Sequence, residues 1–289
     1  EHPLWMFHLM KVHGADVQEV SFETSRDHFI GRGNTISEPK SMIQKEGLSG
    51  NEGSVLDPIV AIQYRVTLKP YETITLDMVY GIGGTQEEGQ RLVEKYQDKH
   101  MIDRAFELAW THSQVVLRQI NATAAEALLY CRMAGSIIYA NASFRADPGI
   151  ILKNHREQSG LWSHSISGDF PIVLLQVEDN TNIELVEQMV KAHAFWRQKG
   201  LIVDLVIWNE DHGGYRQVLQ NQILSLIAPT NVVEEQNRPG SIFVRSADQL
   251  SNEDRILFQT VAQVIISDKL GTLEGQLNRR RKLKPILPN

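Results

Sequence analysis

Cysteine is almost absent from this sequence, because Cys131 is the only one in 289 residues. A single thiol excludes an intramolecular disulfide and a cysteine-rich zinc site, and it fits a reducing compartment. Long apolar runs are absent too. The longest covers residues 201–208, is interrupted by Asp204, and is far shorter than the roughly 20 residues that span a bilayer. No basic-then-apolar leader opens the chain, so we expect neither a signal peptide nor direct membrane insertion.

Several motifs of cofactor and metal chemistry are also missing. There is no G-x-x-x-x-G-K-S/T, no H-E-x-x-H and no G-x-S-x-G. The glycine-rich stretch at 81–86 has Gln86 where a dinucleotide fingerprint needs its third glycine, so we interpret it as a turn. His193 and Asp204 lack ligand spacing, and a packed or surface role is predicted for His193. We therefore expect no cofactor and no metal.

The charge balance argues against nucleic acid as a partner. The net charge is −6, whereas a nucleic-acid surface needs a positive field. A basic run at 279–284 is predicted to end a helix, where cations are favourable, and the prolines after it indicate a linker. With 42% hydrophobic and 22% charged residues, the composition is that of a soluble globular protein of two domains.

The first 83 residues predict β structure. Runs at 4–12, 17–24, 59–68 and 73–80 are rich in β-branched and aromatic residues, and the last two alternate with a period near two, which is typical of half-buried antiparallel strands. A turn is expected at 69–72, between these last two strands. Two such pairs are too few to close a sandwich. We therefore expect that the sandwich begins upstream, that an edge stays exposed, and that the chain is a fragment.

Helices are predicted next, at 86–97, 100–119 and 123–140. Thr85 and Thr123 each precede a glutamate by three residues, which is the capping-box pattern. In the second helix Ile102, Phe106, Ala109, Trp110 and 116–117 recur at three- and four-residue spacing and predict one buried face. These helices resemble a packed connector.

From residue 159 the pattern changes to α/β. Apolar runs at 171–177, 201–208 and 241–245 predict strands, and 183–199, 215–227 and 252–268 predict the helices that follow them. Thr181 and Ser251 are expected to mark two of the helix starts. This order predicts a parallel, Rossmann-like unit.

Two polar clusters are candidate ligand sites. Trp162, His164 and Asp169 precede the first parallel strand, and Asn209, Glu210 and His212 follow the second. An aromatic ring beside convergent polar groups suits a sugar. The alternatives are a structured loop for the first cluster and solvated loops for the second. The clusters are expected at opposite edges of the sheet and therefore in separate sites, and Trp208 is expected in the core.

Four long stretches resemble the cyclic β-1,2-glucan synthases. They are residues 22–33 (FETSRDHFIGRG), 48–59 (LSGNEGSVLDPI), 160–173 (GLWSHSISGDFPIV) and 193–210 (HAFWRQKGLIVDLVIWNE). Members of this family are very large inner-membrane proteins that join a nucleotide-sugar-dependent glucosyltransferase, a ring-closing region and a part similar to inverting disaccharide phosphorylases. The general-acid motif of that last part is not matched at 208–213, so no catalytic residue is assigned.

The resemblance implies a region that connects catalytic parts. The expected fold is mixed α+β and α/β: a partial antiparallel β-sandwich at 1–83, a helical connector at 84–158, and a small parallel α/β module at 159–289 that ends in a basic helix and linker. The expected role is non-catalytic and structural or glycan-handling. The partners are the remainder of the parent polypeptide and, as candidate ligand, β-1,2-glucan; the location is cytoplasmic, with the parent attached to the inner membrane. The alternative is a glycoside phosphorylase or hydrolase with an acid pair in the loops at 178–179 and 210–211.

Overall fold

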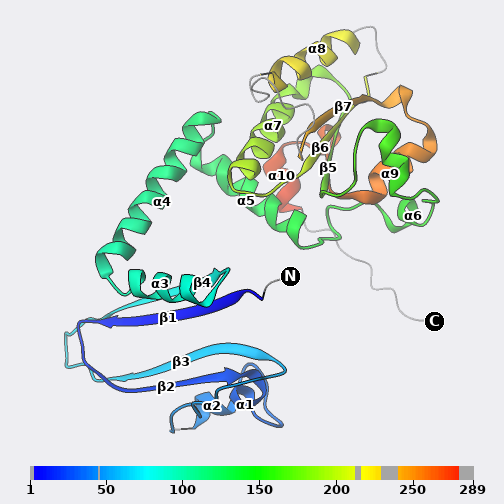
Figure 1. Cartoon of the computed structure of the whole chain (residues 1–289). Coiled ribbons are helices and arrows are strands. Elements are labelled where there is room, and N and C mark those ends of the chain that lie inside the picture. Colours follow the sequence, from blue (N-terminus) through cyan, green and yellow to red (C-terminus); the bar gives the residue numbers. More distant parts are fainter. Residues whose placement is uncertain (1–2, 45, 212–215, 229–239, 280–289) are drawn as a thin grey trace. The chain divides into compact units, whose positions relative to one another are not determined.

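The computed structural model describes residues 3–44, 46–211, 216–228 and 240–279 (Figure 1). Its contacts divide the chain into two compact units, residues 1–111 and 112–289. The boundary between them falls inside one long helix, Lys99–Gln119. The sequence placed domain boundaries at residues 83 and 158, and these stay a prediction. The mixed fold class is confirmed, since antiparallel strands come first, helices follow, and a parallel sheet completes the chain.

The first unit holds two antiparallel strand pairs. β1 (Trp5–His13) pairs with β4 (Thr75–Gly83), and β2 (Val17–Ser25) pairs with β3 (Pro58–Val66). The short helices α1 (Arg26–Ile30) and α2 (Lys40–Ile43) lie in the connection between β2 and β3.

The turn expected at 69–72 is confirmed, because the amide of Glu72 donates to the carbonyl of Lys69 at 3.1 Å, but the two strands that it joins do not pair with each other. β3 and β4 belong to different sheets. The turn between them therefore leads from one layer of the sandwich to the other and does not close a hairpin. The hydroxyl of Tyr64 on β3 donates to the carbonyl of Met10 on β1 at 2.7 Å, which ties the layers together.

One face of the β1–β4 sheet is covered and the other is open. Helix α3 (Gln86–Tyr96) packs on the face that carries Phe7 and Gly81, which are cross-strand partners. On β4 the alternate side chains of the opposite face are exposed: Leu76, Met78, Tyr80 and Ile82. These four side chains form an exposed apolar stripe along β4.

The predicted helices form with the predicted starts. Thr85 caps α3, and Thr123 forms a full capping box at the start of α5 (Ala124–Ile138). Between them lies α4 (Lys99–Gln119). Its predicted single buried face is wrong: Phe106 and Trp110 are exposed, while Ile102 and Val116 are buried. The physical reason is that α4 passes from one compact unit to the other, so that only its ends are buried.

The second unit is a parallel sheet of four strands in the order β7-β6-β5-β8. The strands are β5 (Ile172–Val177), β6 (Asp204–Asn209), β7 (Ile242–Ser246) and β8 (Ala262–Ser267). The helices are α6 (Pro148–Ile151), α7 (Ile183–Gln198), α8 (Arg216–Ile227), α9 (Asn252–Val261) and α10 (Leu273–Asn278). Short 3-10 helices are η1 (Gln158–His164), η2 (Asn180–Asn182), η3 (Ala247–Gln249) and η4 (Asp268–Leu270).

The helix predicted at 252–268 is half wrong. Ser251 caps α9 as expected, but the helix ends at Val261 and residues 262–267 form β8 beside β5. A short apolar run fits a buried strand as well as a buried helix, so periodicity alone does not separate them. The cap predicted at Thr181 is also wrong, because α7 is preceded by η2, which is capped by Asp179. Residues 280–284 of the predicted basic run lie outside the described residues.

Apolar side chains cover both faces of the parallel sheet. One layer joins α5, α7, α8 and α10 to the sheet, with Trp196 fully buried in it. The other joins η1 and α9 to the opposite face, with Trp208 fully buried between β6 and Phe258. The sheet is therefore the middle of three layers, and η1 is fixed against its α9 face.

Candidate functional site

The first candidate cluster begins in a short and tightly packed 3-10 helix. η1 covers Gln158–His164 and ends at Ser165, whose φ of 60° is left-handed. The amides of Ser165 and Ile166 donate back to the carbonyls of Trp162 and Leu161 at 2.9 and 3.2 Å. Leu161 and Ile166 are buried in the layer beneath. The loop therefore presents its polar side chains from a fixed backbone.

Glycine is required inside this helix by close packing. A Cβ on Gly160 would lie 2.7 Å from a methyl carbon of Leu257 on α9. Such a distance is shorter than carbon–carbon contact allows. Gly160 thus lets η1 approach α9 closely.

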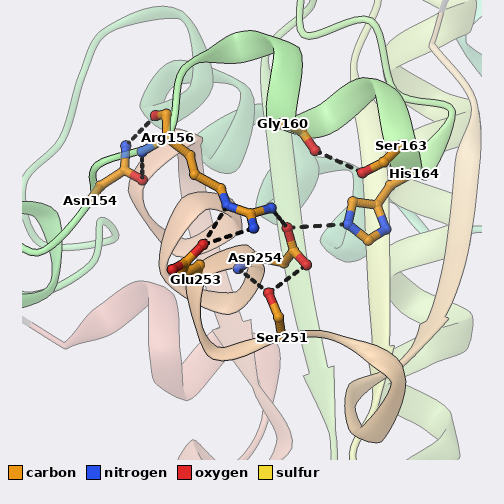
Figure 2. A network of polar contacts seen from close by, with 8 residues as sticks. All are labelled: Asn154, Arg156, Gly160, Ser163, His164, Ser251, Glu253 and Asp254. Carbon is orange, nitrogen blue, oxygen red and sulfur yellow. Dashed lines mark hydrogen bonds and ion pairs between the residues drawn. The ribbon is translucent and has the colours of Figure 1, made fainter.

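A network of polar contacts joins η1 to the start of α9 (Figure 2). The Nε2 atom of His164 lies 3.5 Å from Oδ1 of Asp254, and its ring packs on Phe258 with a centroid separation of 5.1 Å. Asp254 also accepts hydrogen bonds from the Ser251 hydroxyl at 2.6 Å and from Arg156. Burial by itself raises the pKa of Asp254, but the Ser251 hydrogen bond and the Arg156 charge outweigh it and lower the pKa. Asp254 is therefore an ionised anchor for His164.

His164 faces a pocket of about 720 Å³ at the end of β7. The pocket is lined from four parts of the unit: η1, α8, the end of β7 and the link from β7 to α9. The lining residues are Ser163, His164, Gln220, Val244, Arg245, Ser246, Gln249 and Leu250. The carboxyl end of a parallel strand is where open α/β sheets place ligands. We name this cavity the β7 pocket.

The structure does not bring the whole first cluster into one pocket. Trp162 is 64% exposed, and its indole nitrogen donates to the carbonyl of Ser167 at 3.3 Å. Asp169 accepts from the side chain of Gln158 at 3.2 Å and lines a second pocket of about 370 Å³ before β5. His164 alone of the three lines the β7 pocket. Trp162 presents a tethered aromatic ring to solvent.

The second cluster divides between two neighbourhoods. Asn209 is buried at the end of β6, and its amide nitrogen donates to Gln220 of the β7 pocket at 3.4 Å. Glu210 instead lies toward β8, with a carboxylate oxygen 3.9 Å from Nζ of Lys269. His212 lies outside the described residues. Gln220 lines the β7 pocket together with His164 and accepts from Asn209, but neither Asn209 nor Glu210 lines that pocket, so the separation of the two clusters stays a prediction.

The proposed acid pair meets at one lysine. Nζ of Lys269 lies 3.1 Å from Glu178 and 3.9 Å from Glu210. The neighbouring Asp268 is buried and accepts from the backbone amide of Glu178 at 2.7 Å. Burial raises the pKa of Glu210, and the charge of Lys269 opposes that rise. The two carboxylates are thus linked by an intervening cation.

Sequence reasoning missed four residues of these neighbourhoods. Asp268 was assigned to the end of a predicted helix, whereas residues 262–267 form β8 and Asp268 and Lys269 follow that strand in η4, so their place at the carboxyl edge was hidden. Arg245 and Asp254 were seen only as a strand end and a helix cap. A charged residue at the end of an apolar strand, as Arg245 is, was the one available signal.

Two features are absent from the described part of the chain. No cluster of three or more His, Cys, Asp or Glu side chains there could hold a metal ion. None of its helices combines the length and apolar character needed to cross a membrane.

Comparison with known proteins gives two matches. The supersandwich domain of glycosyl hydrolase 94 matches residues 1–99. A cyclic β-(1,2)-glucan synthase, NdvB of Rhizobium meliloti (strain 1021), is 27% identical over 278 residues, which is 96% of this chain. The chain spans 10% of the length of that synthase. The resemblance predicted from the sequence is confirmed, and the chain is similar to a region of a carbohydrate-active enzyme.

Proposed function

We propose that this chain is an accessory, glycan-handling region of a cyclic β-1,2-glucan synthase and that it carries none of the catalytic residues of the parent enzyme. The similarity to a synthase over 96% of the chain supports the parentage. The absence of the general-acid motif at 208–213 supports the accessory role. In this proposal the partner is the remainder of the parent polypeptide, and the region lies on the cytoplasmic side of the membrane that holds the parent.

The observation that carries the glycan-handling role is Trp162. Its side chain is 64% exposed, and its indole nitrogen donates to the carbonyl of Ser167, so the ring lies open to solvent with one edge tethered. Aromatic faces stack on the apolar side of sugar rings, and neighbouring polar groups bind the hydroxyls. Gln158 lies on the same 3-10 helix and supplies such a group. We therefore place β-1,2-glucan on η1.

The test is a titration of the whole chain with β-1,2-glucooligosaccharides, in which isothermal titration calorimetry measures the binding. We expect millimolar or tighter binding that Trp162→Ala abolishes with little change in the thermal midpoint. The matched control is Trp110→Ala, because Trp110 is similarly exposed at 68% but lies on α4. Absence of binding at millimolar glucan, or equal binding by the Trp162 variant, removes the glycan-handling role.

The second candidate function is catalysis by Glu178 and Glu210. Its support is that burial raises the pKa of Glu210, as a general acid requires. Against it, Lys269 approaches both carboxylates and pairs with them as in a structural ion pair. We expect the isolated chain neither to hydrolyse nor to phosphorolyse β-1,2-oligoglucans, and not to transfer glucose from a nucleotide sugar. Turnover that Glu210→Gln abolishes would replace the accessory role with this one.

A further inference from the structure

The β7 pocket has an unusual charge for this protein. The chain has a net charge of −6, yet no aspartate or glutamate is among the described residues that line the pocket. Among the described residues of the lining, Arg245 carries the positive charge. A cavity lined in this way attracts a negative ligand.

Arg245 is held in place without being neutralised by the groups described around it. Its Nη1 donates to the carbonyl of Val244 at 2.9 Å, and its Nη2 donates to the carbonyl of His164 at 2.5 Å. The guanidinium also lies 5.6 Å from the ring of Phe243. Within the described residues no carboxylate forms an ion pair with it.

The burial of this cation has an energetic consequence. Arg245 is half-buried, and burial lowers its pKa, although a guanidinium stays charged in proteins. A partly desolvated cation gains more from an anionic partner than a fully hydrated one does. Carbonyl oxygens fix the orientation of the side chain and leave its net charge uncompensated. The arrangement is that of a preorganised anion contact.

Neutral hydrogen-bonding groups surround this cation. Ser163 and Ser246 bring hydroxyls to the pocket, and Gln220 and Gln249 bring amides. The hydroxyl oxygen of Ser246 is buried and has no hydrogen-bond partner within the described part of the chain. An oxyanion with several oxygens can accept from such donors together.

We propose that the β7 pocket binds the oxyanion group of a small acidic ligand, a phosphate or a carboxylate, with Arg245 as its charged contact. The site is separate from the glycan surface of the proposed function, because Trp162 does not line the pocket. Ser246, Gln220 and Gln249 donate hydrogen bonds around the anion. The carboxylate of Asp254 lies behind His164 and is paired with Arg156, so it does not cancel the charge of the pocket.

The experiment titrates the whole chain with inorganic phosphate, glucose 1-phosphate and glucuronate at low ionic strength, with glucose as the neutral reference. Chemical shifts or calorimetry report binding. We expect saturable binding of at least one anion and none of glucose under the same conditions. Binding of phosphate and glucose 1-phosphate, but not of glucuronate, would identify a phosphate site. Binding of glucuronate alone would identify a carboxylate site.

Three variants assign the binding to the pocket. Arg245→Gln should weaken it by about tenfold or more, the loss expected for a charge-assisted hydrogen bond. Arg245→Lys keeps the positive charge and should weaken the binding less. This variant replaces Arg245→Gln in the test if Arg245→Gln does not fold. Arg255→Gln is the matched control, because Arg255 also donates to a carbonyl, that of Ala247 at 2.5 Å, but does not line the pocket.

Three results would overturn the proposal: no saturable anion binding by the unaltered chain, full binding by the folded Arg245 variants, or an equal loss in Arg255→Gln. Trp162→Ala separates this site from the glycan surface. That variant should keep its anion affinity even where glucan binding is lost, so the two proposals can fail independently.

Discussion

The imidazole of His164 and the carboxylate of Asp254 lie 3.5 Å apart, although one belongs to η1 and the other to the first turn of α9. The same carboxylate accepts from Ser251, which caps α9, and from Arg156. One buried acid thus holds the hydroxyl of the helix cap, pairs with an arginine and contacts a histidine that lines the β7 pocket. Its removal affects all three contacts together.

Replacement of this acid by its amide should destabilise the second unit. We expect Asp254→Asn to lower the free energy of unfolding by about 2 kcal/mol, because hydrogen bonds to a charged group are lost and Arg156 is left without its buried partner. The measurement is urea denaturation at neutral pH. Glu253→Gln is the control, since Glu253 pairs with the same arginine but is exposed; its cost should stay below about 1 kcal/mol. Equal losses in the two variants would contradict the anchoring role of Asp254.

A buried histidine should make the protein sensitive to acid. His193 lies on α7 with its Nε2 atom 2.9 Å from the carbonyl of Val203, and burial lowers its pKa to about 4 from 6.5. The unfolded chain therefore binds a proton between these pH values that the folded chain does not, and stability falls as the pH drops from about 6.5 to about 4. The loss from this one group is about 3 kcal/mol.

The test of that loss compares pH profiles of the free energy of unfolding. His193→Gln keeps a donor for Val203 and should show a flatter profile between pH 6.5 and 4 than the unaltered chain. His112→Gln changes an exposed histidine and should leave the profile as it was. Parallel profiles for the unaltered chain and His193→Gln would show that His193 does not cause the acid sensitivity.

The two tryptophans of the candidate clusters should respond in opposite ways to truncation. Trp208 is fully buried and meets Phe258 edge to face at 6.0 Å, so Trp208→Ala should cost about 3–5 kcal/mol. Trp162 is largely exposed, and Trp162→Ala should change stability by less than about 1 kcal/mol. Thermal or urea denaturation measures both. A large loss in the Trp162 variant would identify its ring as part of the packing of η1.

A glycine in β4 is required by the phenylalanine opposite it. Phe7 and Gly81 are cross-strand partners, and a Cβ on Gly81 would lie 2.1 Å from Cζ of Phe7. Gly81→Ala should therefore destabilise the first unit by about 1–3 kcal/mol, the usual cost of overpacking. In the double variant with Phe7→Leu the loss should be smaller than the sum of the two single losses. Additive losses would mean that the two side chains do not compete for space.

The local elements of this protein follow from the sequence by itself. Thr85, Thr123 and Ser251 predicted three helix starts, and each of them caps a helix, because capping depends on residues three positions apart. Three of the four parallel strands, β5, β6 and β7, were also predicted, because a continuous apolar run is typical of a strand buried on both faces. Trp162 and His164 were noted because unusual polar and aromatic residues lie close together along the chain.

Only the tertiary structure decided which of these elements meet. The pairing of β1 with β4, the identity of β8 and the gathering of His164, Arg245 and Asp254 join segments far apart in the sequence. A short apolar run has the same composition in a helix and in a buried strand, and its neighbours in the fold select between them. Likewise, the role of a charged residue depends on what surrounds it after burial. Arg245 lines a pocket and Asp268 is buried because the sheet places their strand ends there, a long-range consequence of packing that no local pattern contains.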